Sequence, residues 1–122
     1  MVVDDSEEIR FIVRRILEEA GYSVSEAADG EECLQMLYQG EKPDLILLDV
    51  MMPKMDGWGL SRKIKQDPSL QHIPICMLTA KTSTMDALMS LESARANWHL
   101  NKPINRKQLL DTVRWLIENP SQ

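Results

Sequence analysis

Residues 45–59 read LILLDVMMPKMDGWG, and this stretch carries an aspartate to the end of an unbroken apolar run. The apolar residues at 45–48 do not alternate with polar ones, as they would in a strand with one solvated face. Strands covered by helices on both faces, as in parallel sheets, have this continuous apolar pattern. The stretch therefore predicts a buried parallel strand ending at Asp49, with a turn after it.

The rest of the chain alternates between short apolar segments and segments with a 3.6-residue apolar period. The periodic segments predict helices, and they place Ile12 and Tyr38 on the buried faces of the first and second helix. Five alternations of strand and helix predict an α/β domain with a parallel sheet and right-handed crossovers. The expected strands lie at residues 1–3, 22–27, 45–48, 75–78 and 98–100.

Length, charge and cysteine content narrow the class of protein. A chain of 122 residues suits one compact domain, and its net charge of -5 gives no basic excess for non-specific nucleic-acid binding. No apolar run reaches the length of a membrane span, and no basic-then-apolar leader precedes the first strand. Cys33 and Cys76 stand alone, so we expect two reduced core residues and a cytoplasmic protein.

Charged and hydroxyl side chains follow the predicted strands at equivalent positions. Asp4 and Asp5 follow the first strand, Asp49 the third, Thr79 the fourth and Lys102 the fifth. Ligands of open parallel sheets bind outside the carboxyl ends of the strands, so we expect these side chains to meet there. Three clustered carboxylates stay ionised together only beside positive charge, which a hard cation such as Mg²⁺ supplies.

The same residues indicate phosphoryl chemistry. The acidic loop after the first strand would repel a bare phosphate, and the chain has no GxxxxGK[ST] motif, so phosphate would enter together with a metal. Asp49 would then act as a nucleophile that forms an aspartyl-phosphate, with Lys102 offsetting charge and Thr79 donating a hydrogen bond. Each residue also has an ordinary interpretation: a capping acid, a strand-end threonine or a solvated lysine. All of these would have to hold at once, at four strand ends.

Four short motifs resemble the receiver domain of two-component response regulators, in the right order and over essentially the whole chain: VVDD at residues 2–5, LDVMMPKMDG at 48–57, LTA at 78–80 and LNKP at 100–103. The resemblance implies a flavodoxin-like, doubly wound sheet in the order 2-1-3-4-5, flanked by five helices, with residues 1–122 forming one receiver domain. It also implies that Asp49 accepts a phosphoryl group from a sensor histidine kinase or a phosphotransfer protein.

The resemblance implies further roles around Asp49. Asp5, Asp49 and the backbone carbonyl of Met51 would bind Mg²⁺, or Mn²⁺ in its place, and Asp4 would act through water. Lys102 would contact the phosphoryl oxygens.

Other residues would serve the switch or the local structure. Thr79 would swing toward the phosphoryl group together with His99, which stands where the family usually has an aromatic residue. Pro103 would follow a cis peptide bond, and Gly57 would give its turn conformational freedom.

The resemblance also implies partners and leaves alternatives. The face formed by the fourth helix, fifth strand and fifth helix would dock an output protein or domain, or a second copy, without direct contact to nucleic acid or membrane. A phosphatase of the haloacid-dehalogenase type would need an acid where Met51 stands. A phosphorylation-independent receiver-like interaction module is the remaining alternative, and the histidine at position 99 keeps it open.

Overall fold

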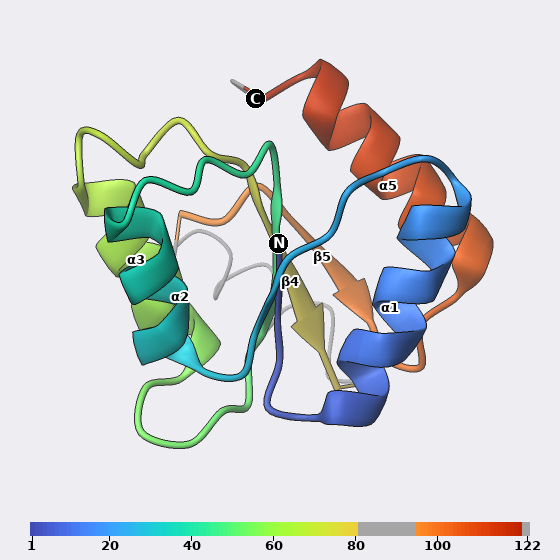
Figure 1. The fold of residues 1–122 in the computed structure, drawn as a ribbon, viewed down its shortest axis with the longest axis horizontal. Coiled ribbons are helices and arrows are strands. Elements are labelled where there is room, and N and C mark those ends of the chain that lie inside the picture. Colours follow the sequence, from blue (N-terminus) through green and yellow to red (C-terminus); the bar gives the residue numbers. More distant parts are fainter. Residues whose placement is uncertain (81–94, 121–122) are drawn as a thin grey trace.

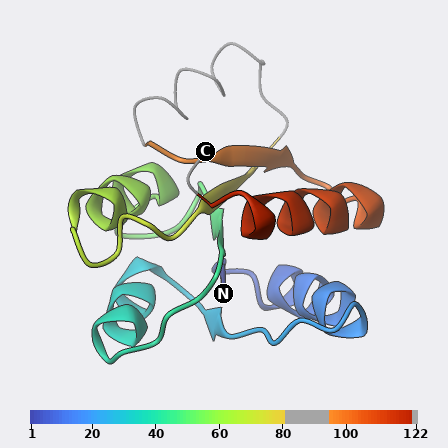
Figure 2. The same cartoon turned by 90° about the horizontal axis from the view of Figure 1, so that it is seen from above.

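The computed structural model describes residues 1–80 and 95–120, and it contains a five-stranded parallel sheet between two pairs of helices (Figure 1, Figure 2). The strand order is β2-β1-β3-β4-β5, and all neighbouring strands are parallel. The predicted fold class and strand order are confirmed. The strands are β1 (Val2–Val3), β2 (Glu26–Ala27), β3 (Ile46–Asp49), β4 (Ile75–Thr79) and β5 (Trp98–Asn101).

Helices cover both faces of the sheet. Helices α2 and α3 lie on one face, and α1 and α5 lie on the other (Figure 2). The fourth helix, expected around Met85, falls outside the described residues. No helix in residues 1–80 and 95–120 is both long enough and apolar enough to cross a membrane. The four described helices are α1 (Glu7–Glu19), α2 (Gly30–Tyr38), α3 (Gly57–Gln66) and α5 (Arg106–Glu118).

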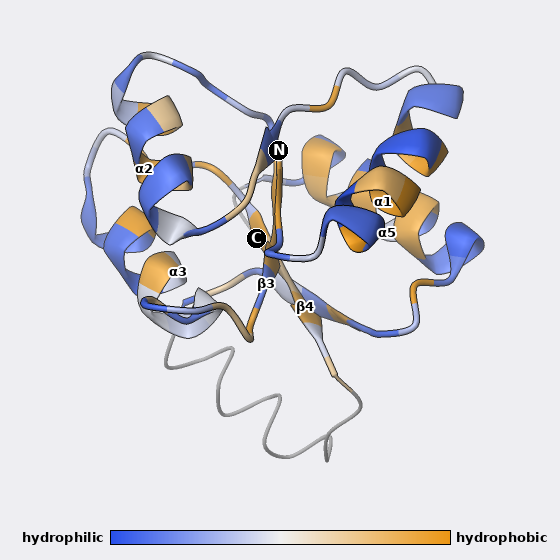
Figure 3. Cartoon of the chain, turned by 60° about the horizontal axis from the view of Figure 1, so that its bottom comes forward, coloured by the Kyte–Doolittle hydropathy of each residue, from blue (hydrophilic) through white to orange (hydrophobic). Residues whose placement is uncertain are grey.

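The core has two layers because successive strand residues point to opposite faces of the sheet. Ile46 and Leu48 pack in the layer under α2 and α3, whereas Leu47 packs in the layer under α1 and α5. Every residue of β3 and β4 is buried, as the unbroken apolar runs predicted. Figure 3 shows hydrophobic residues gathered between the layers and hydrophilic residues on the outer sides of the helices.

A side-chain cap begins each described helix. Such a cap satisfies a backbone N–H at the helix start that has no partner within the helix, and it stabilises the helix by about 1 kcal/mol. Each of these helices follows a strand through a short loop at the carboxyl edge of the sheet, so the caps of α1, α3 and α5 also hold the loops that carry the polar residues. The capping oxygens of Ser6, Asp29, Asp56 and Asn105 accept from the N–H groups of Ile9, Glu32, Gly59 and Gln108 at 3.2, 2.8, 2.8 and 2.9 Å.

Two expectations about the helix faces were wrong. Tyr38 is 64% exposed and Ile12 is 38% exposed, whereas their neighbours Leu37 and Val13 are buried. Successive residues of a helix point about 100° apart, so only one residue of each pair can point straight at the sheet. The second strand is also shorter than residues 22–27, since only Glu26–Ala27 pairs with β1.

Candidate functional site

Three carboxylates meet at the carboxyl edge of the sheet. Asp4 and Asp5 follow β1, and Asp49 is the last residue of β3, which lies beside β1. One oxygen from each carboxylate lies within 4.8 Å of the others. Asp4 and Asp49 are 0% and 3% exposed, whereas Asp5 is exposed. The acidic cluster is therefore two buried carboxylates with a third at the surface.

Lys102 brings an ammonium group into the acidic cluster. It follows β5, and its Nζ lies 3.1 Å from Asp4 Oδ2 and 3.0 Å from Asp49 Oδ1. The Lys102–Pro103 peptide bond is cis, as expected. One oxygen of Asp49 is thus held by Lys102. No group among the described residues donates a hydrogen bond to its other oxygen, Oδ2.

Burial and the contacts between Lys102 and the carboxylates shift the pKa values of these groups in opposite directions. Burial raises the pKa of Asp49, and the neighbouring charge of Asp4 adds to the rise, while the hydrogen bond from Lys102 opposes both. Burial disfavours the charged form of Lys102, yet its hydrogen bonds to Asp49 and Asp4 raise its pKa above the usual value. The contact between Lys102 and Asp49 therefore favours the charged form of each group against the effect of burial.

The donor set fits a divalent cation. Three carboxylates and one ammonium leave two formal negative charges at this edge. Carboxylate oxygens are the protein ligands that Mg²⁺ prefers, and the exposed Asp5 leaves one side of the cluster open to water. Met51 lies two residues beyond Asp49, and its N–H is 3.4 Å from Asp49 Oδ1. The role of its carbonyl as a ligand stays a prediction.

Arg10 and Glu26 support the backbone of the acidic cluster, and the sequence analysis missed them. The Arg10 Nη1 donates to the carbonyl oxygen of Asp4 at 2.6 Å, and its Nε donates to Glu26 Oε1 at 3.0 Å. Arg14 pairs with the other oxygen of Glu26 at 2.8 Å. The peptide between Asp4 and Asp5 is therefore tied to α1 and β2. Only the spacing of Arg10 one helical turn after the cap hinted at this contact.

Thr79 is the buried last residue of β4, and its hydroxyl points toward β5. The Thr79 Oγ1 donates to Asn101 Oδ1 at 2.9 Å and lies 3.4 Å from the carbonyl oxygen of Leu100. The sequence analysis did not single out Asn101. The available signal was its place beside Lys102, opposite Thr79 in the parallel register.

His99 lies on β5 opposite Met77 and is half-buried. Its ring stacks on Trp98, with ring centroids 6.0 Å apart. Its buried Nδ1 has no hydrogen-bond partner among the described residues. Because side chains two residues apart on a strand share a face, His99 lies on the same side of β5 as Asn101. The predicted switch positions, Thr79 and His99, are thus near neighbours.

Gly57 is required for a different reason from the one expected. The glycines with positive φ among the described residues are Gly21 and Gly40, so Gly57 needs no unusual backbone angle. A Cβ at Gly57 would instead lie 2.2 Å from the carbonyl oxygen of Asp49. The Gly57 N–H also donates to the carbonyl of Val50 at 2.8 Å. The first turn of α3 can therefore rest against the end of β3 only without a side chain.

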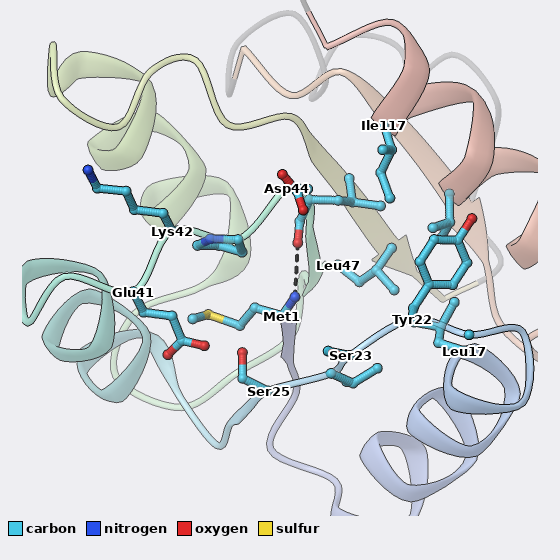
Figure 4. A pocket seen from close by; sticks show the side chains of 15 residues that line it. Met1, Leu17, Tyr22, Ser23, Ser25, Glu41, Lys42, Asp44, Leu47 and Ile117 are labelled. Atoms are coloured by element: carbon cyan, nitrogen blue, oxygen red, sulfur yellow. Dashed lines mark hydrogen bonds between the residues drawn. The ribbon is translucent and has the colours of Figure 1, made fainter.

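A cavity of about 500 Å³ lies at the opposite, amino edge of the sheet. In Figure 4, Met1 lies between Ser25 and Asp44, and its ammonium donates to the carbonyl of Leu45 at 2.9 Å. None of the clustered carboxylates lines this cavity. The cavity thus lies at one edge of the sheet and the acidic cluster at the other. We take the acidic cluster as the candidate site because its side chains can bind a cation and react.

Comparisons with known proteins agree on one family. The family described as response regulator receiver domain matches residues 1–114. The probable transcriptional regulator ycf27 of Cyanophora paradoxa is 42% identical, over 99% of this chain and 50% of that protein. The response regulator PleD of Caulobacter vibrioides is 43% identical, over 95% of this chain and 25% of that protein.

A solved structure is similar over nearly the same span. The signal receiver domain of a signal transduction histidine kinase from Syntrophus aciditrophicus is 35% identical with a TM-score of 0.88, and the match covers 99% of this chain and 90% of that one. The chain spans half of the ycf27 protein and a quarter of PleD. The shared region in these longer relatives is therefore one part of each protein.

Proposed function

Since this chain belongs to the family of response regulator receiver domains, we propose that it is a phosphorylation-dependent switch in two-component signalling. Asp49 accepts a phosphoryl group from the histidine of a sensor kinase or of a phosphotransfer protein. The observation that carries the proposal is the arrangement at Asp49. One of its oxygens is held by Lys102 at 3.0 Å, and the other receives no hydrogen bond from the described residues.

In the proposed step, Asp49 Oδ2 attacks the phosphorus of the phosphohistidine. An O–P bond forms, the P–N bond breaks, and its electron pair returns to the imidazole nitrogen of the donor. Negative charge spreads over the phosphoryl oxygens as the group is transferred. The Lys102 ammonium lies where it can offset this charge, since it already contacts the other oxygen of Asp49. The same residues assist hydrolysis back to the carboxylate, and the domain catalyses no reaction of another molecule.

The acidic cluster would hold Mg²⁺, or Mn²⁺ in its place. Asp5, Asp49 and the carbonyl of Met51 are the proposed direct ligands, and Asp4 is proposed to act through water. When bound, the metal supplies positive charge between the carboxylates and the incoming phosphoryl group. Asp4 also positions the loop, because its Oδ1 accepts from the N–H of Ser6 at 2.9 Å.

The proposed conformational change spreads from the site along β4 and β5. The Thr79 hydroxyl would leave β5 to donate to a phosphoryl oxygen, and His99 would respond on the same face of the sheet. A two-state equilibrium of the face that includes β5 and α5 would then shift. We propose that an output protein, an output domain or a second copy docks there. In keeping with the net charge of -5, the domain itself contacts neither nucleic acid nor membrane.

The proposed function also implies the extent of the domain and its cellular compartment. We propose that residues 1–122 act as one receiver unit in the cytoplasm, where the two buried cysteines stay reduced. The relatives name a transcriptional regulator and a response regulator, and the similar structure comes from a histidine kinase. A receiver domain of this family therefore occurs in proteins with different names and lengths.

Intact mass measurement after incubation with Mg²⁺ and acetyl phosphate tests the proposal. The wild type should gain one phosphoryl group, and Asp49→Ala should gain none. Asp44→Ala is the matched control, because Asp44 is an exposed acid that precedes the amino end of the same strand and should leave the gain intact. A wild type that binds Mg²⁺ but gains no mass would instead support a phosphorylation-independent interaction module.

A further inference from the structure

The contact of Thr79 with Asn101 suggests a control on the switch. We propose that Asn101 is a positioning residue that holds the Thr79 hydroxyl on β5 and so sets how readily the site responds to a phosphoryl group. The inference rests on the proposed function, since it concerns the step after Asp49 is modified. It assigns a role to a residue that touches neither Asp49 nor the acidic cluster through any described hydrogen bond.

The sheet register places the two side chains together. Thr79 pairs with Asn101 across the parallel β4–β5 ladder, so their side chains stand on the same face. The Lys102 N–H donates to the carbonyl of Thr79 at 2.7 Å, which fixes the backbone of both strand ends. Rotation of the Thr79 side chain would then take its hydroxyl away from Asn101 while the backbone of β4 and β5 stays paired.

In that rotation, Asn101 and a phosphoryl oxygen compete as acceptors for the proton of the Thr79 hydroxyl. A threonine hydroxyl has one proton, so Thr79 cannot donate to Asn101 and to a phosphoryl oxygen at the same time. Thr79 is 4% exposed, and water is therefore a poor substitute for the bond it gives up. The alternative acceptor on β5, the carbonyl of Leu100, is farther away at 3.4 Å. Removing the Asn101 oxygen should therefore favour the switched position of Thr79.

The size of the effect follows from the strength of one neutral hydrogen bond. Such a bond changes an equilibrium by about two- to tenfold. Asn101→Ala should therefore raise the apparent affinity for a phosphoryl mimic by about that factor. In Thr79→Val, which has no hydroxyl to hold, the same Asn101→Ala change should have no effect.

The test titrates beryllofluoride in the presence of saturating Mg²⁺ and follows the bound fluoride signal by ¹⁹F NMR. Four proteins form a double-mutant cycle: the wild type, Asn101→Ala, Thr79→Val and the double variant. A purely structural effect of Asn101→Ala would change the affinity both with Thr79 present and in Thr79→Val. An effect of releasing the hydroxyl would change the affinity only where Thr79 is present. Gln108→Ala is the matched control, because Gln108 is an exposed amide that lines the same surface cavity as Asn101 but lies on α5.

A conservative variant gives a second measurement. Asn101→Asp replaces the amide oxygen by a charged acceptor, which holds the Thr79 hydroxyl more strongly, so it should lower the affinity more in the Thr79 background than in Thr79→Val. The repulsion between the aspartate and the phosphoryl mimic acts equally in both backgrounds and cancels in the comparison. The difference between the backgrounds should be at least about twofold, in the opposite direction to that of Asn101→Ala.

Two results would overturn the inference while leaving the proposed function intact. One is that Asn101→Ala binds beryllofluoride with the same affinity as the wild type. The other is an Asn101→Ala gain of equal size in both backgrounds. A wild type that binds Mg²⁺ yet neither binds beryllofluoride nor gains mass from acetyl phosphate would overturn the proposed function, and the inference with it.

Discussion

Replacing Gly57 by alanine tests how closely α3 approaches the end of β3. The added Cβ would lie 2.2 Å from the carbonyl oxygen of Asp49 and 2.9 Å from the methyl carbon of Met77. An ordinary carbon–oxygen contact is about 3.3 Å, so the helix and the strand must separate by about 1 Å. The Gly57 N–H bond to Val50, now 2.8 Å, would then exceed hydrogen-bonding distance.

The loss of stability can be estimated from these two effects. Overpacking of a well-packed site costs about 1–3 kcal/mol, and the lost hydrogen bond costs about 1 kcal/mol more. We therefore expect Gly57→Ala to lower the free energy of unfolding by about 3 kcal/mol. With a urea dependence of about 1–3 kcal/mol per molar, the unfolding midpoint should fall by about 1–3 M.

Gly59→Ala is the matched control, two residues along the same helix. Its Cβ would lie 3.3 Å from Asp56 Oδ1, the capping oxygen of the same helix, and at least 3.8 Å from the other nearest neighbours. Alanine favours helix over glycine by about 1 kcal/mol, so Gly59→Ala should be neutral or stabilising. Urea unfolding followed by circular dichroism measures both variants. Equal midpoints for Gly57→Ala and Gly59→Ala would refute the close approach.

Two further predictions concern buried charge. Burial lowers the pKa of Lys65 to about 8 from 10.5, so the unfolded chain binds its proton more tightly than the folded one between these pH values. The free energy of unfolding, measured across that range, should rise with pH for the wild type relative to Lys65→Met, by at most about 3 kcal/mol. A difference between the two proteins that does not change with pH would contradict the prediction. Arg10→Met should weaken Mg²⁺ binding by about tenfold in calorimetric titration, because the arginine orients the backbone of the acidic cluster. Arg15→Met, on the exposed side of α1, should leave the affinity unchanged, and an equal loss in both variants would assign the effect to charge alone.

The alignment of the site could be predicted because it depends on sheet topology. Parallel strands bring their carboxyl ends to one edge, so the positions of Asp4, Asp49, Thr79 and Lys102 share that edge whatever their side-chain angles are. The unbroken apolar run before Asp49 was enough to indicate a strand covered on both faces. Periodicity alone was too coarse for the helix faces, because residues adjacent in sequence, such as Leu37 and Tyr38, can both fit the apolar stripe.

The contacts that tune the site could not be predicted because they depend on distances between elements. The need for glycine at position 57 comes from the 2.2 Å approach to the Asp49 carbonyl, which no local pattern records. The pairing of Thr79 with Asn101 depends on the rotamers of two side chains on neighbouring strands. Arg10 reaches the Asp4 carbonyl only because α1 begins directly after β1 and lies against it.

The acidic cluster works against the stability of the fold that holds it. Two carboxylates that are 0% and 3% exposed lose hydration and repel each other, and neither loss helps the protein to fold. The chain offsets part of this cost with Lys102 on both carboxylates and with the N–H of Ser6 on Asp4. These contacts leave two negative charges and one oxygen of Asp49 uncompensated among the described groups. A local conflict of this kind is expected where a site is shaped for a ligand rather than for stability, and here the remaining charge matches a divalent cation that would accompany a phosphoryl group.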